Sequence, residues 1–372
     1  MTEQDTHAKS PDTAQSVQID AVASKAKSRV NGPAFSCWYH DRIFRRNIRE
    51  GKEYFNGPSS IPPVDRHSPS SLLQCHRKIK YRQENAPEET QDVDGILWAG
   101  SQIEEELYLP FLRDTVATEN TYVRNSMWID SKVETASCVL QIRGVTDPVI
   151  VDAEGNPLLP TELKSTTSLE YKDSPNAHHR AQLHAYLYGL SEKYDQELTD
   201  GLLVYISRET LELKSFHIEF DEEFWERTVV EWAAAHTEYR ENSDLPPPTP
   251  EFAWECKFCS YRERCGNGSA PYENLGSQGF VPNVEYPREK VLQYIQSQTD
   301  AKLTPTLASK FPEIAEDVDV AGWECPDCSF STIYTSSKQL REAAQPLCPD
   351  CAESGSLVEL REQVDIDQEA DQ

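Results

Sequence analysis

Basic residues are scarce in this chain of 372 residues. Sixteen lysines and twenty arginines face 63 aspartates and glutamates, which leaves a formal net charge of -27. A surface crowded with carboxylates stays hydrated in concentrated salt, where screening makes the mutual repulsion of the charges weak. We therefore expect a protein of a halophilic archaeon's cytoplasm. The alternative is an ordinary acidic soluble protein.

Long apolar runs are also missing. No stretch approaches the roughly 18 residues that a membrane-spanning helix requires, and the first twenty residues lack the apolar segment of a signal peptide. Hydrophobic residues nevertheless make up 38% of the chain, which is enough to form a core. These features exclude a membrane protein and a wholly disordered chain, and they favour a cytoplasmic location.

Changes in composition divide the chain into five segments. We expect a disordered tail over 1–32, a main domain over 33–266, a linker with short helices over 267–320, a small cysteine module over 321–360 and an acidic tail over 361–372. In the main domain the hydrophobic period predicts helices over 95–113, 178–194 and 221–241. Strand-like runs lie between the helices, over 127–133, 138–151, 158–167, 201–208 and 211–220. This order indicates an α/β fold with a mixed sheet flanked by helices.

A carboxylate–lysine constellation lies in the central run GVTDPVIVDAEGNPLLPTELKST. The turn DAEGNP predicts a hairpin, so Asp147 on one strand can meet Glu162 and Lys164 on the next. Alternate residues of a strand share a face, which puts Glu162 and Lys164 side by side. Carboxylate oxygens favour Mg²⁺ or Mn²⁺, and such an ion can activate a phosphodiester toward hydrolysis. A salt-bridged surface hairpin would have the same pattern.

Six motifs in order resemble a known family. The order of six segments resembles that of the motifs in the iron–sulphur branch of RecB-like PD-(D/E)XK nucleases, which includes Cas-four-type CRISPR-associated exonucleases and repair nucleases. The segments are SPSSLLQCHRK, GSQIEEE, GVTD, ELK, QLHAY and CKFCSYRERC. The resemblance covers about residues 68–266. It implies a restriction-endonuclease-like sheet that a four-cysteine iron–sulphur segment closes.

The resemblance also implies roles for individual residues. Asp147 and Glu162 would bind the divalent metal, together with the backbone carbonyl of Leu163. Lys164 would be catalytic, with Gln182 and Tyr186, one helical turn apart, in support. Where the family has a metal-binding histidine on its first helix, this chain has Glu104, which can also bind Mg²⁺ or Mn²⁺. The alternatives are that Glu105 or Glu106 takes this place, or that Glu104 belongs to a solvated helix face.

Eight of the ten cysteines form two sets with the spacing of metal ligands. Cys256, Cys259 and Cys265 lie within ten residues, and the family resemblance adds Cys75 as the fourth ligand of a [4Fe–4S] cluster. Zinc binding by these four thiolates is the alternative. The second set comprises two CPDC turns, Cys325–Cys328 and Cys348–Cys351, whose spacing is typical of a zinc ribbon. Three functions are open to the ribbon: nucleic-acid binding, docking of a partner such as a CRISPR adaptation or repair protein, and stabilisation of the ribbon itself.

Two basic islands stand out in this acidic chain. They contain Arg42, Arg45, Arg46, Arg77, Lys78, Lys80 and Arg82. Phosphate binding requires positive charge, so these residues are candidates for DNA binding. Alternatively, they form salt bridges with the many surface carboxylates.

These patterns favour a Mg²⁺- or Mn²⁺-dependent deoxyribonuclease. The expected reaction is exonucleolytic hydrolysis of single-stranded DNA or DNA ends, in CRISPR adaptation or DNA repair. One alternative is a catalytically weak, nuclease-like DNA-binding subunit of a larger complex. A redox-sensing regulator is a third reading, but it leaves Glu162, Lys164, Gln182 and Tyr186 without a role.

Overall fold

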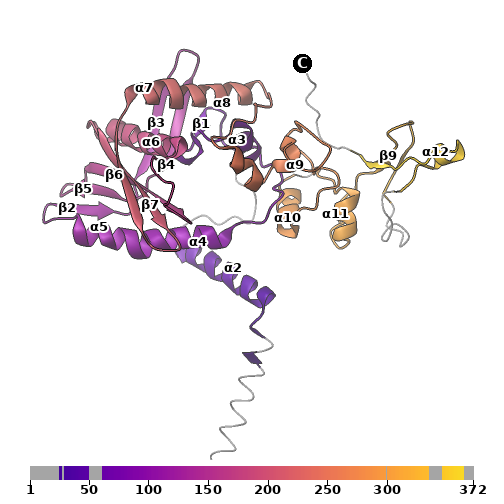
Figure 1. Cartoon of the computed structure of the whole chain (residues 1–372), viewed down its shortest axis with the longest axis horizontal. Helices are drawn as coiled ribbons and strands as arrows, with labels where there is room; N and C mark the ends of the chain where they lie inside the picture. Colours follow the sequence, from indigo (N-terminus) through magenta and orange to yellow (C-terminus); the bar gives the residue numbers. More distant parts are fainter. Residues whose placement is uncertain (1–24, 27–28, 50–60, 299, 335–345, 364–372) are drawn as a thin grey trace, which may run out of the picture. The chain divides into compact units, whose positions relative to one another are not determined.

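The computed structural model describes residues 25–26, 29–49, 61–298, 300–334 and 346–363 (Figure 1). The chain divides into two compact units, 1–57 and 58–372. Helix α2 (Gly32–Arg49) belongs to the first unit. The greater part of the expected N-terminal tail, and residues 364–372 of the expected acidic tail, lie outside the described residues. Within the described ranges, every helix is too short or too polar to cross a bilayer.

A five-stranded mixed sheet forms the centre of the second unit. Its strands lie in the order β2-β5-β6-β7-β8. They comprise β2 (Thr121–Arg124), β5 (Val149–Asp152), β6 (Pro157–Thr166), β7 (Asp200–Ser207) and β8 (Leu213–Glu219). Strands β5 and β6 form the predicted hairpin, with Gly155 at a positive φ of 91° in its turn. Strands β6 and β7 are parallel, and helix α6 (Ala177–Tyr194) connects them.

A second sheet has three strands. Its order is β1-β4-β3, with β1 at Arg66–His67, β3 at Trp128–Glu134 and β4 at Val139–Val145. The chain passes from strand β4 of this sheet into strand β5 of the first sheet. The run 138–151, expected as one strand, is therefore two strands in two sheets. Strand pairing of β4 ends at Val145, and Pro148, which has no backbone N–H, precedes the first residue of β5. Asp147 lies in the link between the sheets rather than on a strand.

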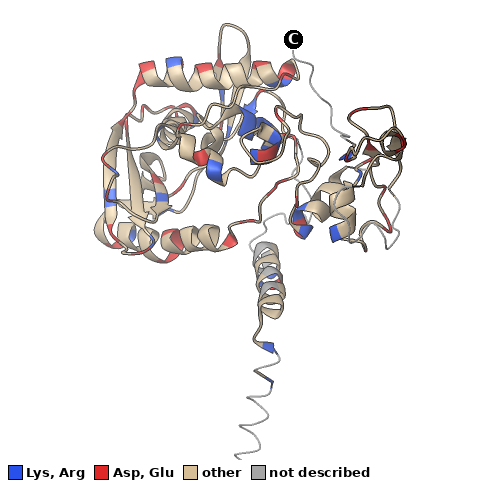
Figure 2. Ribbon diagram, turned by 45° about the vertical axis from the view of Figure 1, so that its right-hand side comes forward, with Lys and Arg blue, Asp and Glu red and all other residues tan. Residues whose placement is uncertain are grey.

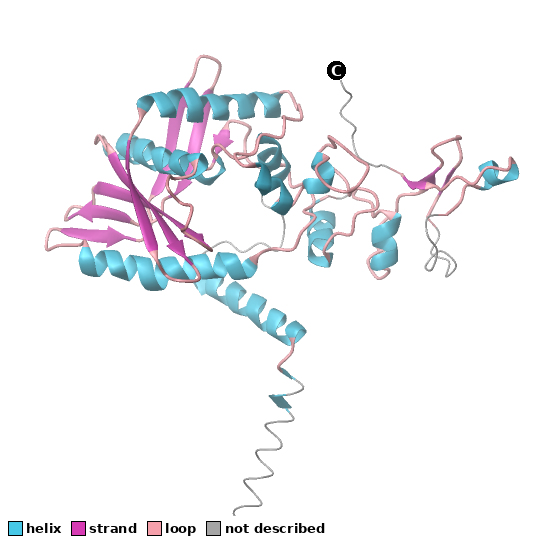
Figure 3. Cartoon of the chain, viewed as in Figure 1, coloured by secondary structure: helices cyan, strands magenta, loops and turns pink. Residues whose placement is uncertain are grey.

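Helices cover both faces of the five-stranded sheet (Figure 3). Helix α6 packs Leu183, Tyr186 and Leu187 against Leu203 and Tyr205 of β7. It also approaches β3 so closely that a Cβ on Gly189 would lie 3.0 Å from Cβ of Ile129. The opposite face of the sheet contacts a second long helix through a separate apolar cluster, which comprises Ile103, Tyr108, Leu109, Leu112, Val123, Val204 and Ile206.

That second helix matches the prediction over 95–113, but it contains one wide turn. It consists of α4 (Asp94–Ile103), a π-helical turn η2 (Glu104–Tyr108) and α5 (Leu109–Thr115). The N–H of Leu109 donates to the carbonyl of Glu104, five residues earlier. Pro110 has no N–H to continue the α-helical pattern, which accounts for a wide turn at this point.

The predicted helix over 221–241 is also present. It comprises α7 (Glu222–Phe224), a π-helical turn η3 (Trp225–Val230) and α8 (Glu231–Glu241). Near the start of the unit, a 3₁₀ turn η1 (Pro69–Ser71) precedes α3 (His76–Gln83). Leu73, at φ 58°, lies in the left-handed region between them, so the two helical segments are not continuous.

The C-terminal part of the unit has two small cores of its own. After η4 (Ala253–Phe258) and α9 (Arg262–Cys265), helices α10 (Arg288–Ser297) and α11 (Pro305–Lys310) pack around a cluster that includes Phe280, Tyr286 and Leu307. Residues 267–320 therefore include packed structure rather than only an extended linker. The last module holds strands β9 (Trp323–Glu324), β10 (Ser331–Thr332) and β11 (Arg361–Glu362), with α12 (Pro349–Glu353).

Candidate active site and cysteine centres

Three carboxylates converge where β4 passes into β5. Asp147, in the link between the two sheets, accepts the backbone N–H of Leu163 on β6 through Oδ2, at 2.8 Å. The carbonyl of a strand residue points toward the same neighbour as its N–H, so the Leu163 carbonyl lies on this edge too. Glu162, the residue before it, contacts Lys164 through Oε1. The expected shared face of Glu162 and Lys164 is thus present.

Glu162 is a buried carboxylate whose charge is poorly compensated. Its exposed fraction is 0%, and within the described residues neither side-chain oxygen has a hydrogen bond of good geometry. Burial raises its pKa to about 8, and the neighbouring Asp147 charge adds to this effect, while Lys164 opposes it. Burial likewise raises the pKa of Asp147, against the lowering by Lys164. Such a pair of carboxylates suits a divalent cation, because the cation would supply the missing positive charge.

Lys164 belongs to a short chain of polar contacts. Its Nζ donates to Oε1 of Gln182 at 3.0 Å, and Nε2 of Gln182 donates to the hydroxyl of Tyr186 at 2.7 Å. Gln182 and Tyr186 are one turn apart on α6 and are both buried. Lys164, Gln182 and Tyr186, which the sequence pattern singled out, are therefore connected by hydrogen bonds in the structure. Gln182 and Tyr186 fix the position of the Lys164 ammonium beside Glu162.

Glu104 faces the same carboxylates from the π-helical turn. Burial raises its pKa to about 7, and the charges of Asp147 and Glu105 add to the rise, while Lys164 lowers it. Glu105 and Glu106 are exposed, so the uncertainty over which glutamate faces the site is resolved in favour of Glu104. Wide helical turns are frequent at functional sites.

Tyr108 is a residue that sequence reasoning missed. Its side chain is 2% exposed. Burial raises its pKa to about 12, a hydrogen bond with Thr161 opposes this rise, and the charges of Asp147, Glu162 and Glu104 add to it. A signal was present in the sequence, because Tyr108 follows Glu104 by four residues and so lies on nearly the same side of the helix.

The first cysteine set lines one small cavity. It is bordered by Cys75, just before α3, by Cys256 on η4, by Cys259 just after η4 and by Cys265 on α9. Burial raises the pKa of the Cys259 thiol to about 11, so the thiolates form only if a metal replaces the protons. Nη1 of Arg77 lies 3.7 Å from Sγ of Cys265 and supplies positive charge beside it. The cavity and its donors fit a bound metal centre.

The second cysteine set is tighter. The Sγ atoms of Cys325 and Cys351 are 3.7 Å apart, and those of Cys328 and Cys348 are 3.6 Å apart. A tetrahedral zinc with Zn–S bonds of about 2.3 Å requires sulphur atoms about 3.8 Å apart. Burial raises the pKa of Cys351. For Cys325, burial is outweighed by the N–H groups of Asp327 and Cys328, which lower the pKa to about 7. These distances fit one zinc ion.

The candidate DNA-binding residues are placed unevenly. Arg77 and Lys80 are 6% and 3% exposed; Arg77 donates to the carbonyl of Pro246, and Lys80 pairs with Glu84 at 2.8 Å. These two do not form part of an exposed basic surface, because their charges are satisfied within the protein. Lys78 is half-buried beside the cysteine cavity, and Arg82 is exposed.

The other basic island lies on α2, in the first unit. Arg42 lies over the ring of Trp38, and Arg45 pairs with Asp41 at 2.8 Å. The side chain of Arg46 is outside the described residues. Figure 2 shows both acidic and basic residues along the long helix at the top of the second unit.

The chain is similar in sequence to known nucleases. A sequence profile of the PD-(D/E)XK nuclease superfamily matches residues 55–266, more than half of the chain. The chain is 26% identical over 223 residues to the CRISPR-associated exonuclease Cas4 of Saccharolobus solfataricus, a match that covers 60% of this chain and 95% of that protein. A solved structure described as the crystal structure of SSO0001 is 21% identical, with a TM-score of 0.40, and the match covers 60% of this chain and 94% of that one.

Proposed function

Because the chain belongs to the PD-(D/E)XK nuclease superfamily, we propose that it is a divalent-metal-dependent deoxyribonuclease that removes nucleotides from single-stranded DNA or DNA ends. The observation that carries this proposal is the convergence of Glu104, Asp147 and the fully buried Glu162 beside Lys164. The similarity to a CRISPR-associated exonuclease supports the exonuclease assignment and a role in CRISPR adaptation or repair.

The residues of the site have distinct roles in this proposal. Glu104, Asp147, Glu162 and the Leu163 carbonyl would hold Mg²⁺ or Mn²⁺, whose oxygen preference they match. When bound, the cation supplies Lewis-acid polarisation of the phosphodiester. Lys164 orients the attacking water and stabilises the negative charge that develops on the phosphate. Gln182 and Tyr186 hold Lys164 in place.

The two cysteine sets would bind different metals. The spacing of the sulphur atoms supports zinc at the four ribbon cysteines, Cys325, Cys328, Cys348 and Cys351. Cys75, Cys256, Cys259 and Cys265 line a cavity and do not share this tight spacing, which supports the larger [4Fe–4S] cluster. The cluster would join α3 to the segment that follows α8, and its role would be structural.

The test is cleavage of end-labelled DNA in molar KCl with Mn²⁺ or Mg²⁺. Single strands, duplexes and circular single strands are compared, because an exonuclease leaves circles intact. Asp147→Ala and Lys164→Ala should each abolish cleavage while circular dichroism and iron content stay unchanged. If either variant cuts at the wild-type rate, the proposed site is wrong. If the wild-type protein binds DNA but cuts none of the substrates with either metal, the chain is a nuclease-like DNA-binding subunit instead.

A further inference from the structure

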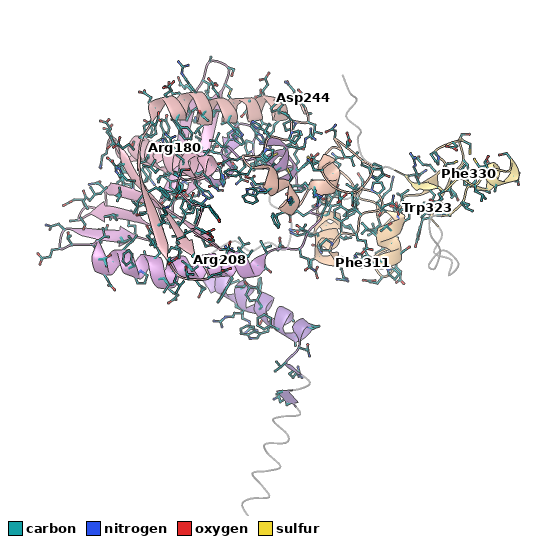
Figure 4. All side chains as sticks on the ribbon, in the orientation of Figure 1. Arg180, Arg208, Asp244, Phe311, Trp323 and Phe330 are labelled. Atoms are coloured by element: carbon teal, nitrogen blue, oxygen red, sulfur yellow. The ribbon has the colours of Figure 1, made fainter. Side chains whose placement is uncertain are left out.

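A cleft outside the carboxylate site opens at the N-terminal end of α6. It encloses about 590 Å³. Its walls come from the loop before α6, from the first turn of α6 and from the segment that leads into η4. Arg180, on the first turn of α6, lines it (Figure 4).

Exposed aromatic rings line this cleft. Tyr171 is 86% exposed, Phe252 37% and Trp254 56%. The rings of Phe252 and Trp254 are nearly parallel, at 15°, with centroids 6.0 Å apart. Phe258, 77% exposed, continues the series edge-on to Trp254 at 6.4 Å. Burying these rings would be favourable, so leaving four of them in water at one place indicates a partner with flat, apolar faces.

The cleft has a less negative charge balance than the chain as a whole, so it repels a polyanion less. Lys172 and Arg180 lie in its wall. Its one carboxylate, Glu251, accepts the N–H of Ala177 at 2.8 Å and contacts Nδ1 of His178 at 2.6 Å, so the helix N-terminus and the imidazole offset its charge. Arg180 also pairs with Asp221 at 2.6 Å. The cleft is thus close to neutral in a chain that carries a net charge of -27.

One side chain joins the cleft to the carboxylate site. The hydroxyl of Tyr205 accepts the N–H of Asn176 at 3.1 Å, and Nζ of Lys172 lies 4.6 Å from the centre of its ring. On β7, Tyr205 pairs in register with Lys164 of β6, so the two side chains lie next to each other on the same face. Tyr205 is buried, so its side chain forms the wall between the cleft and Lys164.

We propose that this aromatic cleft binds the bases of single-stranded DNA by stacking and leads the strand toward Lys164. The proposal rests on the proposed nuclease function and adds the path of the substrate. Base stacking is tolerant of sequence and does not require net positive charge, unlike phosphate binding. It therefore suits an acidic protein whose attraction for phosphates is weak. Paired bases already stack on each other, so duplex DNA gains little in the cleft.

The experiment measures the binding of labelled oligothymidylate by fluorescence anisotropy, without divalent ions so that no cleavage occurs. Tyr171→Ala and Trp254→Ala are compared with Trp128→Ala, which removes a tryptophan that is also exposed, at 44%. Trp128 is a suitable control because it lies away from the cleft. Its backbone carbonyl accepts a hydrogen bond from Lys193, and Lys193 is about 24 Å along α6 from Ala177 in the cleft wall, at 1.5 Å per residue. An oligonucleotide with abasic sites is the second probe.

Each cleft variant should bind oligothymidylate about tenfold more weakly than the wild type, as loss of one base–aromatic stack predicts, and Trp128→Ala should bind normally. The abasic probe should bind weakly to all proteins and show no further loss in the cleft variants. Equal binding of both probes by wild type and cleft variants would overturn the proposal and leave the cleft to another partner.

A small phosphodiester separates failure of the cleft from failure of the active site. Bis(p-nitrophenyl) phosphate carries no strand of bases to lie along the cleft, so with Mn²⁺ the cleft variants should hydrolyse it at the wild-type rate. If the wild-type protein hydrolyses neither this substrate nor DNA, the proposed function fails. If wild type cleaves DNA and the cleft variants cleave and bind it equally well, only the path of the strand is wrong. The iron content of Trp254→Ala shows whether this substitution disturbs the metal centre at the nearby Cys256. Tyr171→Ala tests the cleft from a segment that carries none of the cysteines.

Discussion

Replacing Glu162 with glutamine should stabilise the metal-free protein while abolishing its nuclease activity. The Glu162 pKa is raised from its ordinary value of 4.5 to about 8, chiefly by burial. Between these two pH values the folded protein retains a proton that the unfolded chain has lost. The free energy of unfolding therefore falls as pH rises from about 4.5 to about 8. The native site is strained at neutral pH until a cation binds.

The size of this effect follows from the shift. At about 1.4 kcal/mol per pH unit, a shift of three to four units costs the metal-free protein about 4–5 kcal/mol at pH 8. Glutamine carries no charge but loses the contact with Lys164, which is partly exposed and can be hydrated. A net gain of about 2 kcal/mol remains, which corresponds to a melting temperature about 4–8 °C higher.

The assay is thermal unfolding at pH 6 and pH 8, in buffer freed of Mg²⁺ and Mn²⁺ by a chelating resin so that the cysteine centres keep their metals. Glu162→Gln should melt above the wild type at pH 8, with a smaller difference at pH 6. Added Mn²⁺ should stabilise the wild type by mass action but not the variant. Glu105→Gln, which changes an exposed glutamate, should match the wild type throughout. If Glu162→Gln melts at or below the wild-type temperature at pH 8, Glu162 is not a strained, metal-seeking carboxylate.

Three further predictions concern other parts of the structure. Cys75→Ser should lose iron and keep zinc, and Cys348→Ser should do the reverse, as elemental analysis can show; two zinc ions and no iron in the wild type would refute the cluster. Tyr108→Phe should fold normally but need several-fold more Mn²⁺ for half-maximal cleavage, because its buried hydroxyl faces the metal-binding carboxylates; an unchanged Mn²⁺ titration would contradict this. Burial, helped by Arg240 and His76, lowers the His67 pKa to about 4, so stability should fall as pH drops from 6.5 toward 4, and His67→Gln should flatten that fall in denaturant titrations.

The sequence predicted the parts of the site that depend on local periodicity. Glu162 and Lys164 share a face because they are two residues apart on a strand, and Gln182 and Tyr186 share one because they are four apart on a helix. The position of Asp147 depends on a change of sheet between Val145 and Val149, which is a tertiary event that no local pattern specifies.

Burial of charged residues was equally hard to predict. Arg77 and Lys80 belong to a run without acidic residues, which suggested an exposed basic surface. Their partners, the Pro246 carbonyl and Glu84, include one that is 169 residues away in the chain. The choice of Glu104 over Glu105 likewise depends on how the π-helical turn packs, and helical period alone leaves the neighbouring glutamates as rivals.

The cysteine cavity and the aromatic cleft are mechanically connected through one short segment. Glu251, Phe252 and Trp254 of the cleft directly precede Cys256, and the spacer before them has no regular secondary structure. A cluster bound at Cys75 and Cys256 would hold this segment against α3, and the contact of Glu251 with the N-terminus of α6 holds its other end. Glu104, Asp147 and Glu162 all lie outside this segment. If the cluster positions the strand as proposed, its loss in Cys75→Ser should weaken single-stranded DNA binding more than hydrolysis of a small phosphodiester.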